Sequence, residues 1–119
     1  MKSLIFSLVF MLVGFVSFSQ EAVIPSAEVF KKSVLNGKIE MTLPAEITKE
    51  NVSKYSKYYT AFFTTSFDEK SHQITFNMVS NDAKSRRVII RFLSANRVQF
   101  AKVGESTLPL SNFYDAYLK

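Results

Sequence analysis

The apolar residues between positions 38 and 103 follow alternating strand and helix periods, and this order constrains the fold more than any other feature. Ile39, Met41 and Leu43 are separated by polar residues, a pattern typical of a strand with one buried face. After this strand, Thr48 can cap a helix whose apolar positions recur at intervals of three and four residues. The segment thus begins with a half-exposed strand and an amphipathic surface helix.

A β-hairpin follows, and then a second helix and a fourth strand. Residues 60–67 are aromatic and β-branched, and residues 73–78 alternate between apolar and polar side chains on the other side of a polar turn. The Asn81-Asp82 pair begins the next helix, and Asn96 is expected to end it in a left-handed conformation. Residues 97–103 form the last predicted strand. The predicted order is therefore strand, helix, strand, strand, helix, strand.

With right-handed crossovers over one sheet, this order predicts an α+β fold of the ferredoxin-like βαββαβ type, a sandwich with extra N- and C-terminal helices. In element order, residues 38–103 resemble heavy-metal-associated domains and other small ferredoxin-like modules. Members of that family carry paired cysteines between the first strand and the first helix, where this chain has TLPAEI at residues 42–47. The resemblance therefore implies a fold, and it does not imply copper-carrying activity.

Residues 1–19 have the features of an export signal. Lys2 gives a positive start, residues 4–16 are mostly apolar, and Ser17-Phe18-Ser19 places small residues at the positions that a signal peptidase reads. We expect cleavage before Gln20; the alternative is an uncleaved membrane anchor, although the apolar run is shorter than the roughly 20 residues of a membrane span. Because exported eukaryotic domains of this size usually carry disulfides, we expect a bacterial periplasmic or secreted protein.

The rest of the chain is expected to form one α+β domain preceded by a helical extension. Ser26 can cap a helix that ends at Asn36-Gly37, and this helix is assigned to an N-terminal helical extension over residues 20–37. The sequence leaves open whether this helix packs on the core. The domain itself spans residues 38–119 and ends in a short helix that Ser111 can cap. Its docking groups are expected to be Phe113, Tyr114, Tyr117 and Leu118.

The composition excludes several classes of site. The chain has 119 residues, no cysteine and one histidine, so it has no disulfide framework, thiolate metal site or thiol nucleophile. Its sequence contains no Gly-rich phosphate loop, nucleophile elbow or two-histidine metal motif. His72 lies near Asp68 and Glu69, but their spacing matches no calcium loop. We therefore expect no enzymatic activity, no cofactor and no metal site.

A basic cluster in the second predicted helix of the domain is one candidate binding surface. Its members are Lys84, Arg86, Arg87 and Arg91. Spacings of three and four residues place all of these except Arg86 on one helix face. This face is suited to an anion such as an acidic glycan or a lipid headgroup; the alternative is a solvated face in a protein with 15 Lys and Arg against 10 Asp and Glu. Lys54 and Lys57 would extend the cluster if the two helices lie side by side.

Aromatic residues form the other candidate surface. Phe62 and Phe63 are neighbours in a predicted strand, so one ring is expected to leave the helix-covered face of the sheet. That ring is either covered by a terminal helix or part of a binding site. Tyr117 and its aromatic neighbours either close the open face of the sheet within the monomer, which we expect, or contact another chain. The partner-binding candidates are thus Phe62, Phe63 and Tyr117.

Nucleic-acid binding is not expected. RNA-recognition modules with this element order stack bases on aromatic residues of the two central strands. The exposed positions predicted for those strands here are all polar: Lys38, Glu40, Thr42, Gln73, Thr75 and Asn77.

Together these features predict a small exported, non-catalytic binding or accessory domain that acts through protein–protein interaction in the cell envelope. Its partner would be an envelope or extracellular protein, bound by the outer sheet face, the basic helix or both. One alternative is an anion-binding module for acidic glycans or lipid headgroups, acting through Lys84, Arg87 and Arg91. Another is an enzyme with a dispersed site, which a deep pocket lined by several polar groups would favour.

Overall fold

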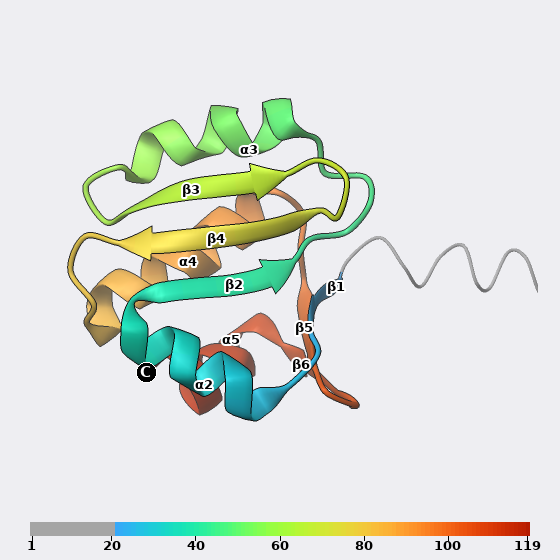
Figure 1. Ribbon diagram of the computed structural model, residues 1–119, viewed down its shortest axis with the longest axis vertical. Helices are drawn as coiled ribbons and strands as arrows, with labels where there is room; N and C mark the ends of the chain where they lie inside the picture. The colour runs from blue at the N-terminus through green and yellow to red at the C-terminus, as the bar shows by residue number, and fades with distance from the viewer. Residues whose placement is uncertain (1–20) are drawn as a thin grey trace, which may run out of the picture.

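The computed structural model describes residues 21–119, so the predicted export signal and its cleavage site lie outside the described residues. Over this range the chain forms an α+β fold in which a mixed six-stranded sheet is combined with four helices (Figure 1). In chain order the elements are β1 (Glu21–Ile24), α2 (Ala27–Asn36), β2 (Lys38–Thr42), α3 (Lys49–Ser56), β3 (Phe63–Asp68), β4 (Gln73–Met78), α4 (Ala83–Ala95), β5 (Phe100–Val103), β6 (Ser106–Pro109) and α5 (Leu110–Phe113). A 3-10 turn over Lys57–Tyr59 follows α3, and a π-helical turn over Tyr114–Leu118 follows α5.

The strand order is β3-β4-β2-β1-β5-β6, which corrects the predicted ferredoxin-like topology. In a ferredoxin-like sheet the first and last strands are neighbours. Here β1 lies between β2 and β5; it is antiparallel to β2 and parallel to β5. The sequence did not indicate β1 because its four residues, EAVI, are too few to establish a period. The second missed strand, β6, is mostly exposed and ends in a proline.

The sheet divides where β1 leaves β2. These two strands share one register pair, Val23 with Thr42, whereas β1 pairs with β5 along its whole length. As a result β2, β3 and β4 run across the molecule in Figure 1 while β5 and β6 run nearly at right angles to them. The helix α2 and the C-terminal segment meet beside this division, where the Phe30 ring lies 5.5 Å from Phe113 and 6.0 Å from Tyr117.

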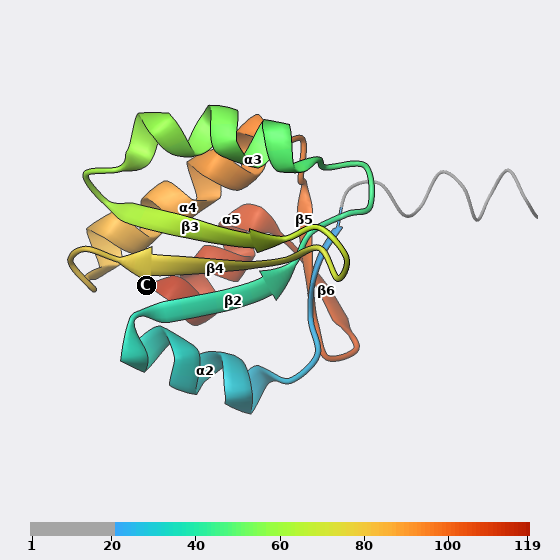
Figure 2. The same cartoon turned by 45° about the horizontal axis from the view of Figure 1, so that its top comes forward.

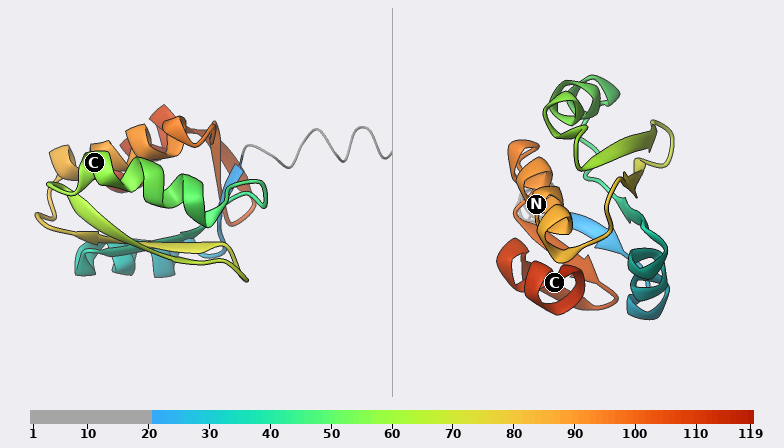
Figure 3. Two further views of the ribbon diagram at one scale, coloured as in Figure 1. Left: turned by 90° about the horizontal axis from the view of Figure 1, so that it is seen from above. Right: turned by 90° about the vertical axis from the view of Figure 1, so that its left-hand side faces the viewer.

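The helices α3 and α4 cover the same face of the sheet and lie next to each other (Figures 2 and 3). Phe92 of α4 is fully buried, with its ring 5.4 Å from Phe76 of β4 and 6.1 Å from Phe63 of β3. Tyr59, after α3, places its ring 6.4 Å from Phe92. This aromatic cluster holds both helices against the sheet, and it leaves their opposite faces in solvent.

The predicted caps of the three longer helices are confirmed. The Ser26 hydroxyl accepts from the Val29 amide, Thr48 forms a capping box with Asn51, and Asp82 accepts from the Ser85 amide at 2.7 Å. Gly37 ends α2 in the left-handed region, with φ of 76°. Each cap satisfies an amide or carbonyl that the helix itself leaves unpaired.

Two predicted helix ends are wrong. Asn96 was expected in the left-handed region but has φ of −90°, and Arg97 takes the positive φ of 66° instead. The Asn96 side chain instead donates to the Phe92 carbonyl at 3.0 Å, a bond that forms within the last helical turn. Ser111 does not cap the terminal helix, because α5 begins one residue earlier at Leu110, directly after Pro109.

The segment that the sequence set apart as an N-terminal extension shares the core of the domain. In residues 21–37, Ala22 and Ile24 of β1 are buried, and so are Phe30 and Val34 of α2. The C-terminal segment is also part of this core, since Phe113 and Leu118 are fully buried. Within the described part of the chain, no helix has both the length and the apolar character needed to cross a bilayer.

Truncation of Phe92 tests this core. We expect Phe92→Ala to lower the free energy of unfolding by about 3–5 kcal/mol, because the ring contacts the sheet and the segment after α3 and its loss leaves a cavity. Urea denaturation followed by circular dichroism measures the change. Leu35→Ala is the matched control: its side chain is 80% exposed, so the change should stay within about 0.5 kcal/mol. Equal losses in the two variants would contradict this placement of the core.

Candidate anion-binding surface

The solvent face of α4 carries three of the four basic residues that the sequence singled out. Lys84, Arg87 and Arg91 are exposed, and they lie opposite the buried positions of the helix. Those buried positions are Ser85, Val88, Ile89, Phe92 and Leu93. Because the aromatic core fixes the inner face, the outer face and its three cations are fixed as well. We call Lys84, Arg87 and Arg91 the basic stripe.

Arg86 lies apart from this stripe and has a structural role. Its side chain is partly buried, its Nε donates to the Leu118 carbonyl at 2.6 Å, and its NH1 donates to the Asn81 Oδ1 at 2.8 Å. The Asn81 amide in turn donates to the carbonyl of Val34 at the end of α2. Arg86 therefore connects α4 to the C-terminus and, through Asn81, to α2.

The middle of the basic stripe is held by an aromatic ring. The Arg87 guanidinium lies 5.3 Å from the centroid of the buried Tyr114 ring, within the range of a cation–π interaction. The Tyr114 hydroxyl donates to the Ala83 carbonyl at 3.2 Å, which fixes the ring against the first turn of α4. Arg87 thus loses less side-chain freedom on binding a ligand than an unsupported arginine would.

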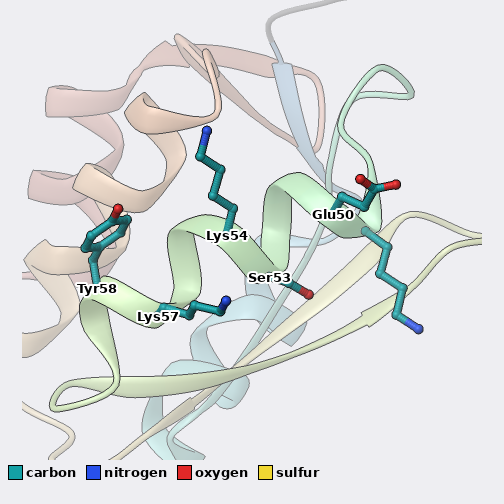
Figure 4. Close-up of a pocket in the computed structure, with 6 residues that line it drawn as sticks. Glu50, Ser53, Lys54, Lys57 and Tyr58 are labelled. Atoms are coloured by element: carbon teal, nitrogen blue, oxygen red, sulfur yellow. The ribbon is translucent and has the colours of Figure 1, made fainter.

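The neighbouring helix α3 adds further positive charge. A shallow depression of about 570 Å³ on its outer side is lined by Lys49, Glu50, Ser53, Lys54, Lys57 and Tyr58 (Figure 4). Lys54 and Tyr58 project toward the side on which α4 lies, whereas Lys57 points away from it. Of the two lysines expected to extend the cluster, only Lys54 is therefore directed to the side of α4.

The aromatic partner-binding candidates are mostly used in packing. Phe63 is fully buried against Phe76, with ring centroids 5.1 Å apart. We expected Phe62 and Phe63 to be neighbours within one strand, with one ring on each face. However, β3 begins at Phe63, so Phe62 precedes the strand, and the Phe62 ring is partly buried against the core. Tyr117 is half-buried next to Phe30 and Phe113. None of the three rings is fully exposed.

The outer face of β2, β3 and β4 is polar throughout, and the C-terminal aromatic residues do not close it. Along β2 and β4, the outward positions are those predicted from the sequence. On β3 they are Thr64, Ser66 and Asp68. The C-terminal segment instead packs against α4, α2 and the β5–β6 strands. This sheet face therefore presents polar and charged side chains.

A groove of about 960 Å³ lies where the C-terminal end of α4 meets α3, and the sequence did not predict it. Its lining residues are Glu46, Ile47, Asn51, Tyr55, Ser94, Ala95, Asn96, Arg97, Val98, Gln99 and Leu110. They come from three separate segments that only the tertiary fold brings together. Glu46 is the only acidic residue among them, and no histidine lines the groove. It therefore lacks the paired acid and base that hydrolytic chemistry uses.

Among residues 21–119, no group of three histidine, aspartate or glutamate side chains is placed to hold a metal ion. His72 lies in the β3–β4 turn, with its ring edge-on to Phe67 at 5.5 Å. The Asp82 carboxylate caps α4, and the hydrogen bond from the Ser85 amide holds its pKa below the ordinary value.

Comparison with protein families, curated proteins and solved structures gives no match at the level of family model, sequence or fold. The class that the fold defines is an α+β domain with a mixed six-stranded sheet and interleaved helices. Function must accordingly be argued from the surface itself.

The cap of α4 makes the stability of this surface depend on pH. The Ser85 amide, then the Ser85 side chain and the charges of Arg86 and Lys84, lower the pKa of Asp82 below its ordinary value of 3.8. Because the folded pKa is the lower one, the carboxylate stabilises the fold above about pH 3.8, and this contribution is lost as the pH falls through the folded pKa.

We therefore expect Asp82→Ala to lower the melting temperature most at neutral pH, with the difference from the wild type shrinking in acid. Calorimetry at pH 7 and at stepwise lower pH measures this. Asp82→Asn keeps a neutral capping group and is the control for the hydrogen bond alone. A difference that stays constant with pH would show that the charge does not contribute.

Proposed function

We propose that the protein is a non-catalytic binding domain that holds an acidic glycan against its helical face. The observation that carries this proposal is the basic stripe of α4, three exposed cationic residues on one face of a helix that the core holds in place. Lys54 projects from α3 toward the side on which α4 lies. Like charges at this spacing repel one another, so a polyanion that neutralises them is favoured. The predicted export signal would deliver the domain to the periplasm or the outside of a bacterium.

A glycan fits this surface better than a lipid bilayer does. Helices that bind at a membrane surface combine basic residues with large apolar side chains that enter the bilayer. Within residues 21–119, Tyr58 is the only strongly exposed large hydrophobic side chain next to the lysines of α3; Val29 and Leu35 lie on α2, and Val79 follows β4. The groove at the end of α4 instead offers amide, hydroxyl and carboxylate groups, which hydrogen-bond sugar hydroxyls.

Binding to an envelope protein through Phe62, Phe63 and Tyr117 has less support, because these rings are mainly used in the fold. A partner protein with an acidic surface could also bind the basic stripe. The experiment below distinguishes an acidic glycan from an acidic protein, because its probe contains only sugar.

Charge reversal on the basic stripe tests the proposal. The variant carries Lys84→Glu, Arg87→Glu and Arg91→Glu, and its affinity for hexagalacturonate at low salt is measured by calorimetry. We expect at least about tenfold weaker binding, because attraction becomes repulsion at three positions. Raising the salt concentration should weaken binding by the wild type, since exposed charges are screened.

The matched control carries Lys38→Glu, Lys70→Glu and Lys102→Glu. These three lysines are exposed but lie on β2, in the hairpin turn and on β5, and the net charge of the chain changes by the same amount. The control should bind hexagalacturonate far better than the stripe variant. Equal losses of affinity in the two variants would mean that the overall charge alone governs binding to hexagalacturonate. If the wild type instead binds vesicles of anionic phosphatidylglycerol and does not bind the glycan, a membrane function replaces the proposal.

A further inference from the structure

Three loops meet at one end of the molecule, on the left of Figure 1. They are the turn after α2, the segment between α3 and β3, and the loop between β4 and α4. Backbone hydrogen bonds join them: the Met78 amide donates to the Gly37 carbonyl, and the Val79 amide donates to the Phe62 carbonyl, each at 2.9 Å. The three loops therefore form one continuous surface whose parts hold one another in place.

Exposed apolar side chains gather on this surface. Leu35, Tyr58 and Val79 are 80, 72 and 62% exposed, and they are three of the five exposed large hydrophobic residues in the described chain. The Asn81 side chain donates to the Leu35 carbonyl at 3.3 Å, which places Leu35 beside the loop that carries Val79. Single exposed apolar residues are ordinary, whereas a group at one end of a domain points to an interaction site. We call Leu35, Tyr58 and Val79 the apolar tip.

The chain around the apolar tip is strongly basic. Residues 31–38, 57–63 and 77–87 carry seven basic residues and one acidic one, Asp82, whose carboxylate caps α4. All of these basic residues except Arg86 are exposed: Lys31, Lys32, Lys38, Lys57, Lys84 and Arg87. The rest of the described chain carries seven basic and nine acidic residues. Positive charge is therefore concentrated at the end of the molecule that presents the apolar tip.

We infer that the apolar tip docks on the surface of an anionic lipid bilayer. Leu35 and Val79 enter the boundary between headgroups and acyl chains, and Tyr58 keeps its hydroxyl among the headgroups. Lys38 and Lys57, which lie next to the tip in the chain, pair with lipid phosphates. The inference goes beyond the proposed function, because it concerns a different surface of the domain and a different ligand.

A lipid surface fits the tip better than other partners do. A stable protein interface buries about 800 Å² on each side and is poor in lysine, whereas the tip consists of three side chains on adjoining loops with lysines beside them. An acidic glycan would bind the lysines but has no apolar layer for Leu35 and Val79 to enter. An anionic bilayer has both negative charge at its surface and hydrocarbon beneath it.

Docking by the tip leaves the basic stripe accessible. The helix α4 begins at the tip end of the molecule and runs away from it (Figure 1). The stripe starts at Lys84, in the first turn of the helix, and reaches Arg91 about 10 Å farther along. A glycan would therefore bind along a face that extends away from the bilayer, and one domain would hold the glycan close to a membrane.

Removal of the aliphatic groups of the tip tests the inference. The variant carries Leu35→Ser and Val79→Ser, and its binding to vesicles of phosphatidylglycerol and phosphatidylethanolamine is measured by co-sedimentation. The chain is used from Gln20 on, a range that contains the whole described core, so that the apolar segment of the predicted signal does not itself bind lipid. We expect at least about tenfold weaker binding than that of the wild type, because two apolar side chains no longer enter the bilayer.

The matched control carries Val23→Ser and Val29→Ser. Val29 is 65% exposed, like the tip residues, but it lies in the first turn of α2, at the other end of that helix from Leu35. The control should bind the vesicles as the wild type does, and both variants should keep a melting temperature close to that of the wild type, because all four side chains are exposed. Equal losses of binding in the two variants would overturn the inference, and so would a wild type that does not bind the vesicles.

The charge of the lipid provides an independent test. Lys38→Glu with Lys57→Glu should bind the same vesicles at least about tenfold more weakly than the wild type does, because attraction to the lipid phosphates becomes repulsion. Lys70→Glu with Lys102→Glu changes the net charge equally, in the hairpin turn and on β5, and should bind nearly as the wild type does. Wild-type binding should weaken in high salt and on neutral phosphatidylcholine vesicles. Binding that does not depend on the lipid charge would overturn the inference.

Nuclear magnetic resonance shows which surface meets the lipid. In bicelles that contain phosphatidylglycerol and a nitroxide-labelled lipid, the methyl signals of Leu35 and Val79 should be broadened most. Those of Val23 and Val29 should be broadened least. Equal broadening at all four residues, or broadening that is greatest at Val23 or Val29, overturns the placement of the bilayer at the tip.

The inference and the proposed function fail separately. If the tip does not dock on lipid, the vesicle experiments fail, whereas hexagalacturonate still binds the wild type and the stripe variant still loses that binding. If the proposed function is wrong, hexagalacturonate does not bind the wild type, whereas vesicle binding still depends on Leu35 and Val79. If both hold, the variant with Leu35→Ser and Val79→Ser binds hexagalacturonate as the wild type does.

Discussion

The position of Phe92 between sheet and helices determines which surfaces this protein presents. Its ring packs edge-on against Phe63, Phe76 and Tyr59, so α4 cannot rotate about its axis without breaking the core. The outward direction of Lys84, Arg87 and Arg91 follows from this constraint. A charged surface built on a helix so held keeps a fixed geometry, which suits it to recognition better than a cluster of lysines on a loop.

The polar contacts of Arg86 have a complementary effect. Four basic residues stand close together in α4, and the fold uses one of them to bind the Leu118 carbonyl and the Asn81 side chain. The C-terminal segment is thereby held beside α4, where its Tyr114 supports Arg87. One of the four basic residues is thus used in the fold, whereas Lys84, Arg87 and Arg91 stay exposed.

Local patterns predicted most elements but not their assembly. Spacing and residue type were enough to predict the hairpin, the polar outer face of the sheet and the caps at Ser26, Thr48 and Asp82. These features depend mainly on residues that are close together in the sequence. The insertion of β1 beside β5 and the groove at Asn96 depend on contacts between distant segments, so no local period indicates them. The basic stripe was predictable from its spacing alone. The same spacing sets Arg86 apart from the stripe, whereas its bond to the Leu118 carbonyl depends on the tertiary fold.

The pairing of β1 with β5 also affects the order in which the protein folds. Among the described strands, the first in the chain, β1, has its longest register with β5, which lies close to the C-terminus, and it shares only one register pair with β2. During synthesis, β1 therefore has almost no lasting partner until the ribosome has made nearly the whole chain, and non-local pairings of this kind form late. A chain that completes its fold so late remains unfolded for longer and can still pass through a translocation channel. This suits a protein whose first residues resemble an export signal.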